Sequence, residues 1–446
     1  MSDRRDVRKS LDLALRIGEI LLVSGAAATD VAATMEAVTR ACGLRNVSAD
    51  VTFNDLTLRH QPNNDEPVAI QVRRVSRRPI DYAELIEVET VVHDLVSGDL
   101  TRDGARDEVA RIMSSGLHRK PSAVTIGWGV MGAGVALTLG GDAVVCLLAF
   151  LAAVAIDRTR VLLRLGRIPL FYQQAAGGLL ATVVAVIAAA TRLEPNPSRV
   201  VTAGIIMLLA GVGITGATQD AITGFPVTAT ARMLDALLNT TGIIAGVGAG
   251  LSLSGLLAIE PGTLTPAANG LATAGVTVIG AALAATGFAL ASCAPFRSLI
   301  AVALVGALGQ TVMVSVDTTG LGRTWGAAAA AVAIGAVCYV VSGRFRLPPL
   351  VVVVPAIVPL LPGLDIYRGL ALFAAGRDGV LQLAAAFATA LALAAGVTLG
   401  QYLAQPLKRE ARRLETRLTA PHMIGPFRHS SGGDEPENGN QAQPTP

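Results

Sequence analysis

The chain has 446 residues, of which 52% are hydrophobic and only 15% are charged, and its formal net charge is +3. Long apolar blocks follow one another along the sequence, whereas a soluble core is built from short apolar runs, so the composition predicts a polytopic α-helical membrane protein. The small net charge and the presence of only three lysines give no indication of a nucleic-acid-binding surface.

Residues 1–120 precede the long apolar blocks and predict an α+β domain on the cytoplasmic side of the membrane. The run from Leu11 to Val23 is interrupted by Arg16 and Glu19, and no small-residue cleavage site that precedes a mature domain stands out. It therefore predicts an amphipathic helix and not a signal peptide. The expected elements are helices over 11–23 and 29–42, a hairpin of strands over 51–59 and 68–75, and helices over 81–95 and 102–113.

The sequence carries no motif for an enzyme, a cofactor or a metal site. Ser24-Gly25 does not lie within a G-x-S-x-G turn, and the adjacent His93 and Asp94 point to different faces of a helix. No Gly-Lys dipeptide occurs, so a Walker A loop for ATP is excluded. The five histidines form no H-x-x-x-H pair and the four cysteines have no metal or redox spacing, so we expect no cofactor and no metal.

From residue 121 onwards the sequence predicts about ten membrane spans, each near the roughly 20 apolar residues that a bilayer requires. A break near residues 259–262 divides them into two groups of five, over residues 121–260 and 261–405. Because each group holds an odd number of spans, the second enters the membrane in the opposite sense, as in an inverted repeat. The expected spans are 122–140, 142–156, 171–190, 199–218, 236–257, 267–291, 297–316, 324–342, 348–374 and 379–404, and residues 406–446 form a basic and then disordered tail.

Arginine and lysine residues in the short loops predict the orientation. Basic residues cluster after the second, sixth, eighth and tenth spans and are sparser in the alternate loops, so the first set of loops is expected to face the cytoplasm. Both termini of this cytoplasmic (inner) membrane protein then lie in the cytoplasm. The clusters consist of Arg158, Arg160, Arg164, Arg167, Arg297, Arg344, Arg346, Lys408, Arg409, Arg412 and Arg413.

The stretch from Gln219 to Asp235 interrupts two apolar runs with charges and helix breakers. The runs cover 200–217 and 236–257, and the stretch contains Asp220, Gly224, Pro226 and Arg232. Polar, irregular backbone is tolerated at membrane depth only where it is buried in protein or lines a water-filled cavity, so the stretch predicts a transport site. A structural alternative stays open, in which Gln219 and Asp220 cap a helix and Arg232 pairs with Asp235 at the interface.

A second interrupted segment occupies the corresponding place in the other half of the chain. It reads LPPLVVVVPAIVPLLPGLDIYRG and is broken by prolines and a glycine. Interrupted segments at matching positions of two halves are a sequence pointer to the substrate site of a secondary transporter. The residues expected to bind substrate are Gln219, Asp220, Gly224, Thr228, Arg232, Asp235, Asn239, Pro359, Pro362, Gly363 and Tyr367.

Two of these residues have specific expected roles. Arg232 offers a planar guanidinium that matches a substrate carboxylate. Asp220, at the end of an apolar run, is the expected proton-coupling group, because partial desolvation favours its protonated form. Asp235 is the competing candidate, although Arg232 three residues earlier is expected to hold its charge.

Four segments together resemble the bacterial threonine/serine exporter (ThrE) family. They are LLVSGAAATDVAATMEAVTRACGL, PLFYQQAAGG, GATQDAITGFPVTATARMLDALLNTTGIIAGV and VPAIVPLLPGLDIYRG, and the resemblance covers residues 10–404. It implies export of threonine and serine by antiport with protons. Some relatives divide the two halves between separate chains, one of them linked to succinate export, so an exporter of a dicarboxylate or another small organic acid stays open. A membrane-anchored hydrolase also stays open as an alternative function, and a homo-oligomer stays open as the state of assembly.

Overall fold

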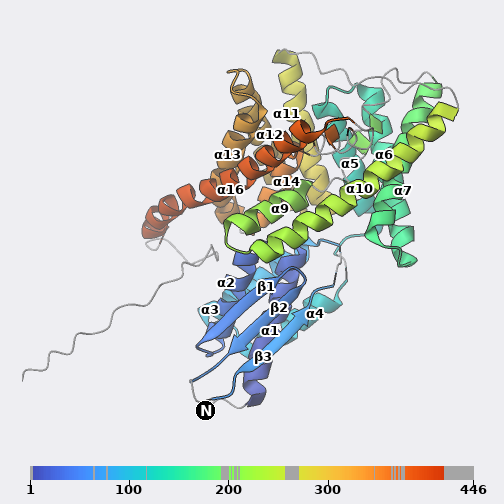
Figure 1. Ribbon diagram of the computed structural model, residues 1–446. Helices are drawn as coiled ribbons and strands as arrows, with labels where there is room; N and C mark the ends of the chain where they lie inside the picture. Colours follow the sequence, from blue (N-terminus) through green and yellow to red (C-terminus); the bar gives the residue numbers. More distant parts are fainter. Residues whose placement is uncertain are drawn as a thin grey trace, which may run out of the picture.

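The computed structural model places an N-terminal unit, residues 4–116, against one end of a bundle of long helices (Figure 1). The bundle begins at residue 121, where the long apolar helices start. The residues that the structure describes are 4–63, 66–76, 79–116, 118–191, 200–201, 203–204, 208, 211–256, 271–345, 347–362, 365, 368–369, 372 and 377–415.

The N-terminal unit packs four helices with a three-stranded antiparallel sheet of order β1-β2-β3. Apolar side chains from α1, α2 and the inner face of β2, among them Leu15, Met35 and Leu58, form its core. The elements are α1 (Arg4–Val23), α2 (Ala28–Ala41), β1 (Val47–Thr52), β2 (Asp55–His60), β3 (Ala69–Arg74), α3 (Tyr82–Ser97) and α4 (Arg102–Ser114).

The strand expected over residues 51–59 is wrong in one respect, because the chain reverses in its middle. Phe53 adopts a left-handed conformation with φ of 51°, and β1 and β2 pair antiparallel on either side of Phe53 and Asn54. Asn54 is a turn-forming residue, whereas alternating apolar residues on both sides of it resemble one continuous strand. The expected hairpin is therefore part of a three-stranded meander.

The helical bundle contains every remaining described element. Seven of its helices are long and apolar enough to cross a membrane, in agreement with a polytopic membrane protein; they are α5, α7, α10, α11, α12, α13 and α16. The bounds are α5 (Pro121–Thr138), α6 (Ala143–Leu165), α7 (Leu170–Ala190), α9 (Gly211–Ile222), α10 (Pro226–Leu256), α11 (Leu271–Ala291), α12 (Phe296–Asp317), α13 (Arg323–Phe345), α14 (Pro349–Ile357), η1 (Val358–Leu360) and α16 (Val380–Glu415).

The other three of the ten expected spans differ from these seven helices. The second falls in α6, whose C-terminal half carries Asp157 and three arginines and is more polar than the seven. The described part of the fourth overlaps the 12-residue helix α9, which continues four residues beyond the expected end of that span. The ninth begins as the short apolar segment Pro349–Leu360, and much of its remainder lies outside the described residues.

Glycines let α5 and α11 cross at close range. A Cβ atom on Gly127 would lie 3.0 Å from the carbonyl oxygen of Gly287, and one on Gly287 would lie 2.8 Å from that of Gly127. Gly134 and Gly280 face each other in the same reciprocal way, each at 2.8 Å from the other's carbonyl oxygen. Small residues at such a crossing bring two membrane helices into backbone contact, which is how these helices associate without a hydrophobic driving force.

We expect Gly287→Ala to destabilise the bundle, because the added methyl group would collide with the backbone of Met131 on α5. Overpacking of this kind costs about 1–3 kcal/mol. Gly275→Ala on the same helix is the matched control, since a Cβ atom there meets nothing within 4 Å. Thermal unfolding of the purified full-length protein in detergent measures both, and equal melting temperatures would contradict the close crossing.

Candidate functional site

The break between α9 and α10 is present where Gly224 and Pro226 predict it. The backbone N–H of Phe225 donates to the carbonyl oxygen of Asp220 at 2.8 Å, and Gly224 lies between them with φ of 94°. This is the glycine-terminated helix end in which a left-handed residue closes the last turn. Pro226 then starts α10, a position where its missing N–H costs nothing. The two helices form a hairpin above the N-terminal unit (Figure 1).

Asp220 lies fully buried at this hairpin and forms an ion pair with Arg232. A guanidinium nitrogen of Arg232 is 2.6 Å from Oδ2 of Asp220, and the Arg232 side chain is itself only 16% exposed. The structure thus pairs Arg232 with a carboxylate on the neighbouring helix, a partner that helical spacing did not predict. Asp235, the expected partner, accepts a hydrogen bond from Nδ2 of Asn239 at 3.2 Å.

The N-terminal unit contacts the same ion pair through the start of α2. The backbone N–H of Ala28 donates to Oδ1 of Asp220 at 2.8 Å, and Arg232 donates to the carbonyl oxygen of Ala26 at 3.5 Å. The residue before the helix, Ala27, offers no side-chain cap. Asp220 therefore caps α2 from 192 residues away, and a carboxylate at a helix N-terminus is stabilised there by the free N–H groups and the helix dipole.

Thr228 forms a second polar contact between the bundle and the N-terminal unit. Its hydroxyl donates to the carbonyl oxygen of Val51 at 2.7 Å and accepts from the N–H of Phe53 at 3.1 Å. Phe225 packs against the apolar core of the unit next to this contact. The face of α10 that carries Thr228 and Arg232 is therefore covered by the N-terminal unit.

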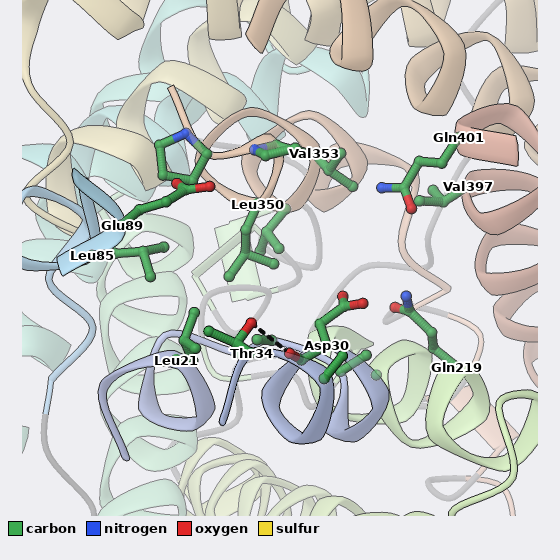
Figure 2. A pocket seen from close by; sticks show the side chains of 18 of the residues that line it. Leu21, Asp30, Thr34, Leu85, Glu89, Gln219, Leu350, Val353, Val397 and Gln401 are labelled. Atoms are coloured by element: carbon green, nitrogen blue, oxygen red, sulfur yellow. Dashed lines mark hydrogen bonds between the residues drawn. The ribbon is translucent and has the colours of Figure 1, made fainter. Parts of the chain in front are cut away.

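A cavity of about 170 Å³ lies between the N-terminal unit and the bundle. Helices α1, α2 and α3 form one wall, and α9, α13, α14 and α16 form the other. Figure 2 shows Asp30, Gln219 and Gln401 pointing into this space from α2, α9 and α16, with Glu89 on the far side. Among the described residues that line the cavity, Asp30 and Glu89 are the charged ones, and both are acidic.

Asp30 carries an unusual carboxyl group. Asp30 is exposed along the cavity, although protein atoms crowd the rest of its side chain. The partial desolvation that this crowding causes, together with the nearby negative charge of Asp220, raises the pKa of Asp30 from its ordinary value to about 6. The group therefore changes its charge close to physiological pH.

Thr215 on α9 adds a polar group to the cavity wall. Its side chain is 4% exposed, and within the described part of the chain its hydroxyl has no hydrogen-bond partner. A buried hydroxyl without a partner is costly, so such groups in native proteins call for an explanation. Because Thr215 lines the cavity, a molecule bound there is a candidate partner for this hydroxyl.

The expected site residues do not all meet in one place. Gln219 lines the cavity, whereas Asp220 and Arg232 lie next to it at the contact with α2. The second interrupted segment reaches the cavity through α14, with Leu350, Val353, Val354 and Ile357, and the break itself follows in η1. Pro359 lies in η1 and Pro362 in the turn after it, outside the cavity lining, and Gly363 and Tyr367 lie outside the described residues.

Several residues of the cavity were missed in the sequence. Thr215 and Gln401 are polar residues within apolar helices, which is a usable signal, because such residues in membrane segments tend to be functional. Asp30 gave no comparable signal. It reaches the cavity only because α2 docks on Asp220, a contact that no local pattern encodes.

Comparison with known proteins gives the family. A family described as "Putative threonine/serine exporter" matches residues 12–254, and one described as "Threonine/Serine exporter, ThrE" matches residues 277–403. The chain belongs to the threonine/serine exporter family. It is 35% identical over 427 residues to the "Threonine/serine exporter" of Corynebacterium glutamicum, covering 92% of this chain and 86% of that protein.

A second relative agrees. The "Probable threonine/serine exporter" of Mycobacterium tuberculosis is 36% identical over 424 residues, which cover 92% of this chain and 79% of that protein. No solved structure matches the chain. The family resemblance expected from the four sequence segments is confirmed, and so is the prediction that the chain is a transporter rather than an enzyme.

We expect Thr228→Val to loosen the N-terminal unit from the bundle, because Val51 and Phe53 would each lose a hydrogen-bond partner. Unsatisfied groups of this kind cost about 1–3 kcal/mol. Thr241→Val is the control, since that exposed hydroxyl bonds only within α10. Hydrogen exchange at the β1–β2 turn should rise in Thr228→Val alone, and unchanged protection there would contradict the proposed contact.

Proposed function

We propose that the protein exports threonine and serine from the cytoplasm across the inner membrane, by antiport driven by the proton gradient. The observation that carries this proposal is the charge of the cavity, whose charged lining residues in the described structure are the acids Asp30 and Glu89. An amino acid brings an ammonium group that these carboxylates attract. The names of both relatives, threonine/serine exporters, point to the same substrates.

The charge of the cavity disfavours the alternative substrates. A dicarboxylate would bring two negative charges next to Asp30 and Glu89, and like charges at close range in a poorly solvated site repel strongly. The cavity is also small, and its remaining lining is largely apolar, as the methyl group of threonine requires. A hydrolase has no support from the family of exporters to which the chain belongs.

We further propose that the two halves of the bundle form an inverted repeat. Helix α12 begins at Phe296 and α6 at Ala143, and α13 begins at Arg323 and α7 at Leu170; both differences are 153 positions. The crossing glycines of α5 and α11 follow the same offset, since Gly127 corresponds to 280 and Gly134 to 287. Reciprocal contacts between corresponding residues are what a two-fold axis between two repeats produces.

The ion pair supplies a mechanism for coupling export to protons. While Asp220 is charged, it holds Arg232 and the N-terminus of α2. A proton on Asp220 would release both, which frees the Arg232 guanidinium for the substrate carboxylate and loosens the N-terminal unit beside the cavity. In this scheme both termini and the N-terminal unit face the cytoplasm, and the substrate enters from that side.

The test is efflux from proteoliposomes that contain the full-length protein and are loaded with labelled threonine, serine or succinate. We expect a proton gradient to drive threonine and serine out, an uncoupler to stop this uphill efflux, and succinate to stay inside. Gradient-driven efflux of succinate without that of either amino acid would overturn the proposal. If the uncoupler did not affect threonine efflux, the part of the proposal that couples export to protons would be wrong.

Arg232→Lys keeps the charge but loses the planar fork that binds a carboxylate through two hydrogen bonds. We therefore expect the apparent affinity for threonine to fall about tenfold, which corresponds to one charge-assisted hydrogen bond. Arg323→Lys, at the exposed start of α13, is the matched control. Wild-type affinity in Arg232→Lys would exclude Arg232 from substrate binding.

Asp220→Asn removes the titrating group while it keeps the shape of the side chain. We expect uphill export to be lost and downhill exchange of threonine to remain. Because Arg232 then stays buried without its counter-charge, at a cost of about 3–5 kcal/mol, the double variant Asp220→Asn/Arg232→Gln serves to restore stability without restoring uphill export. Asp317→Asn at the exposed end of α12 is the control. If Asp220→Asn still concentrated threonine in an uncoupler-sensitive way, the proton-coupling group would have to be Asp235 or another carboxylate.

A further inference from the structure

We propose that the cavity between the N-terminal unit and the bundle is the entry site for the exported amino acid, in which Asp30 binds the ammonium group and Thr215 binds the side-chain hydroxyl. This inference rests on the proposed function and adds to it a binding residue from outside the membrane bundle. The site would recognise a small zwitterion with a hydroxyl group, which is the chemistry shared by threonine and serine.

Asp30 is suited to bind a cation because nothing in the described structure neutralises it. Its neighbour Asp220 is paired with Arg232 and capped by the N–H of Ala28, whereas no ion pair joins Asp30 to a described residue. A carboxylate that is partly desolvated and lacks a counter-charge is unfavourable, and an ammonium group in the cavity relieves that cost. Glu89 is the other acidic residue in the described lining of the cavity.

Thr215 supports the same occupant independently. Its hydroxyl is buried at the cavity wall without a partner in the described part of the structure, and it sits one helical turn before Gln219 on α9. A site that leaves a buried polar group unpaired discriminates strongly against an analogue that cannot pair with it. The amide groups of Gln219 and Gln401, which point into the same space in Figure 2, offer N–H donors for the substrate carboxylate.

The state of Asp30 depends on pH in a range that matters for transport. With a pKa of about 6, the carboxyl group of Asp30 is mostly ionised at neutral pH and mostly protonated below pH 6. It therefore holds an ammonium group at neutral pH and releases it in acidic surroundings. The titratable and charged groups around it are Asp220 on α9, Arg232 on α10, Glu89 on α3 and Tyr339 on α13. Arg232, the cation among these groups, is held in the ion pair with Asp220.

The experiment measures binding to the purified full-length protein in lipid nanodiscs by calorimetry. The probes are threonine, threonine methyl ester, which keeps the ammonium group, and N-acetylthreonine, which lacks it. We expect the wild type to bind the first two and to bind N-acetylthreonine at least tenfold more weakly. Asp30→Asn should lose at least tenfold in affinity for threonine and its ester, and wild-type threonine affinity should fall as the pH drops through 6.

The controls separate a binding role from a structural one. Asp107→Asn removes an exposed carboxylate on α4 and should bind like the wild type. Asp30→Glu keeps the charge and should retain part of the affinity together with its pH dependence, and thermal unfolding shows whether each variant is folded. A folded Asp30→Asn protein with wild-type affinity and the same pH profile overturns the role of Asp30.

Thr215→Val tests the second contact with an isosteric change. We expect the wild type to prefer threonine over 2-aminobutyrate, which lacks the hydroxyl, by at least tenfold, and Thr215→Val to bind both about equally while unfolding no sooner than the wild type. An unchanged preference overturns the role of Thr215.

The proposed function and this inference fail in different ways. Wild-type proteoliposomes that export neither amino acid, or a wild-type protein that binds no threonine, would remove both. Export by the wild type with full threonine affinity in Asp30→Asn would remove only the entry site.

Discussion

The carboxylate of Asp220 imposes the constraint on which the arrangement of this protein depends. A fully buried charge must be neutralised, and removing one partner of such a pair costs about 3–5 kcal/mol. Two partners satisfy Asp220, the guanidinium of Arg232 and the N–H of Ala28. Because they belong to α10 and to the N-terminal unit, one side chain of α9 fixes three parts of the fold relative to one another.

The same contact shapes the cavity. Asp30 lies two residues after Ala28 in α2, so the cap that Asp220 provides also holds Asp30 at the cavity wall, and Gln219 precedes Asp220 on the opposite side. The negative charge of Asp220 in turn contributes to the raised pKa of Asp30. The charge of the ion pair and the protonation of Asp30 are therefore linked, since a proton that alters one carboxylate changes the field at the other.

The sequence predicted the local features of this region and missed the contacts between distant segments. Gly224 and Pro226 gave the break after α9, because their backbone preferences act within a few residues. The ion-pair partner of Arg232 was not predicted from the sequence. Helical spacing pointed to Asp235, but Arg232 forms its ion pair with Asp220 on the neighbouring helix, and the link from Asp220 to Ala28 spans 192 residues. Composition likewise gave a polytopic protein, whereas a family resemblance was needed to name its substrates.

The N-terminal unit touches both halves of the bundle, and the two contacts differ in chemistry. Toward the second half, Tyr82 donates a backbone hydrogen bond to Ser292 at 2.8 Å, which does not respond to pH in the physiological range. Toward the first half, Thr228 bonds to Val51 and Phe53, and a second contact runs through Asp220 and Arg232, which do carry charge. If the halves move against each other during transport, the unit must release one of them. The charged contact is the one that a proton weakens, so protonation acts on the contact with the first half.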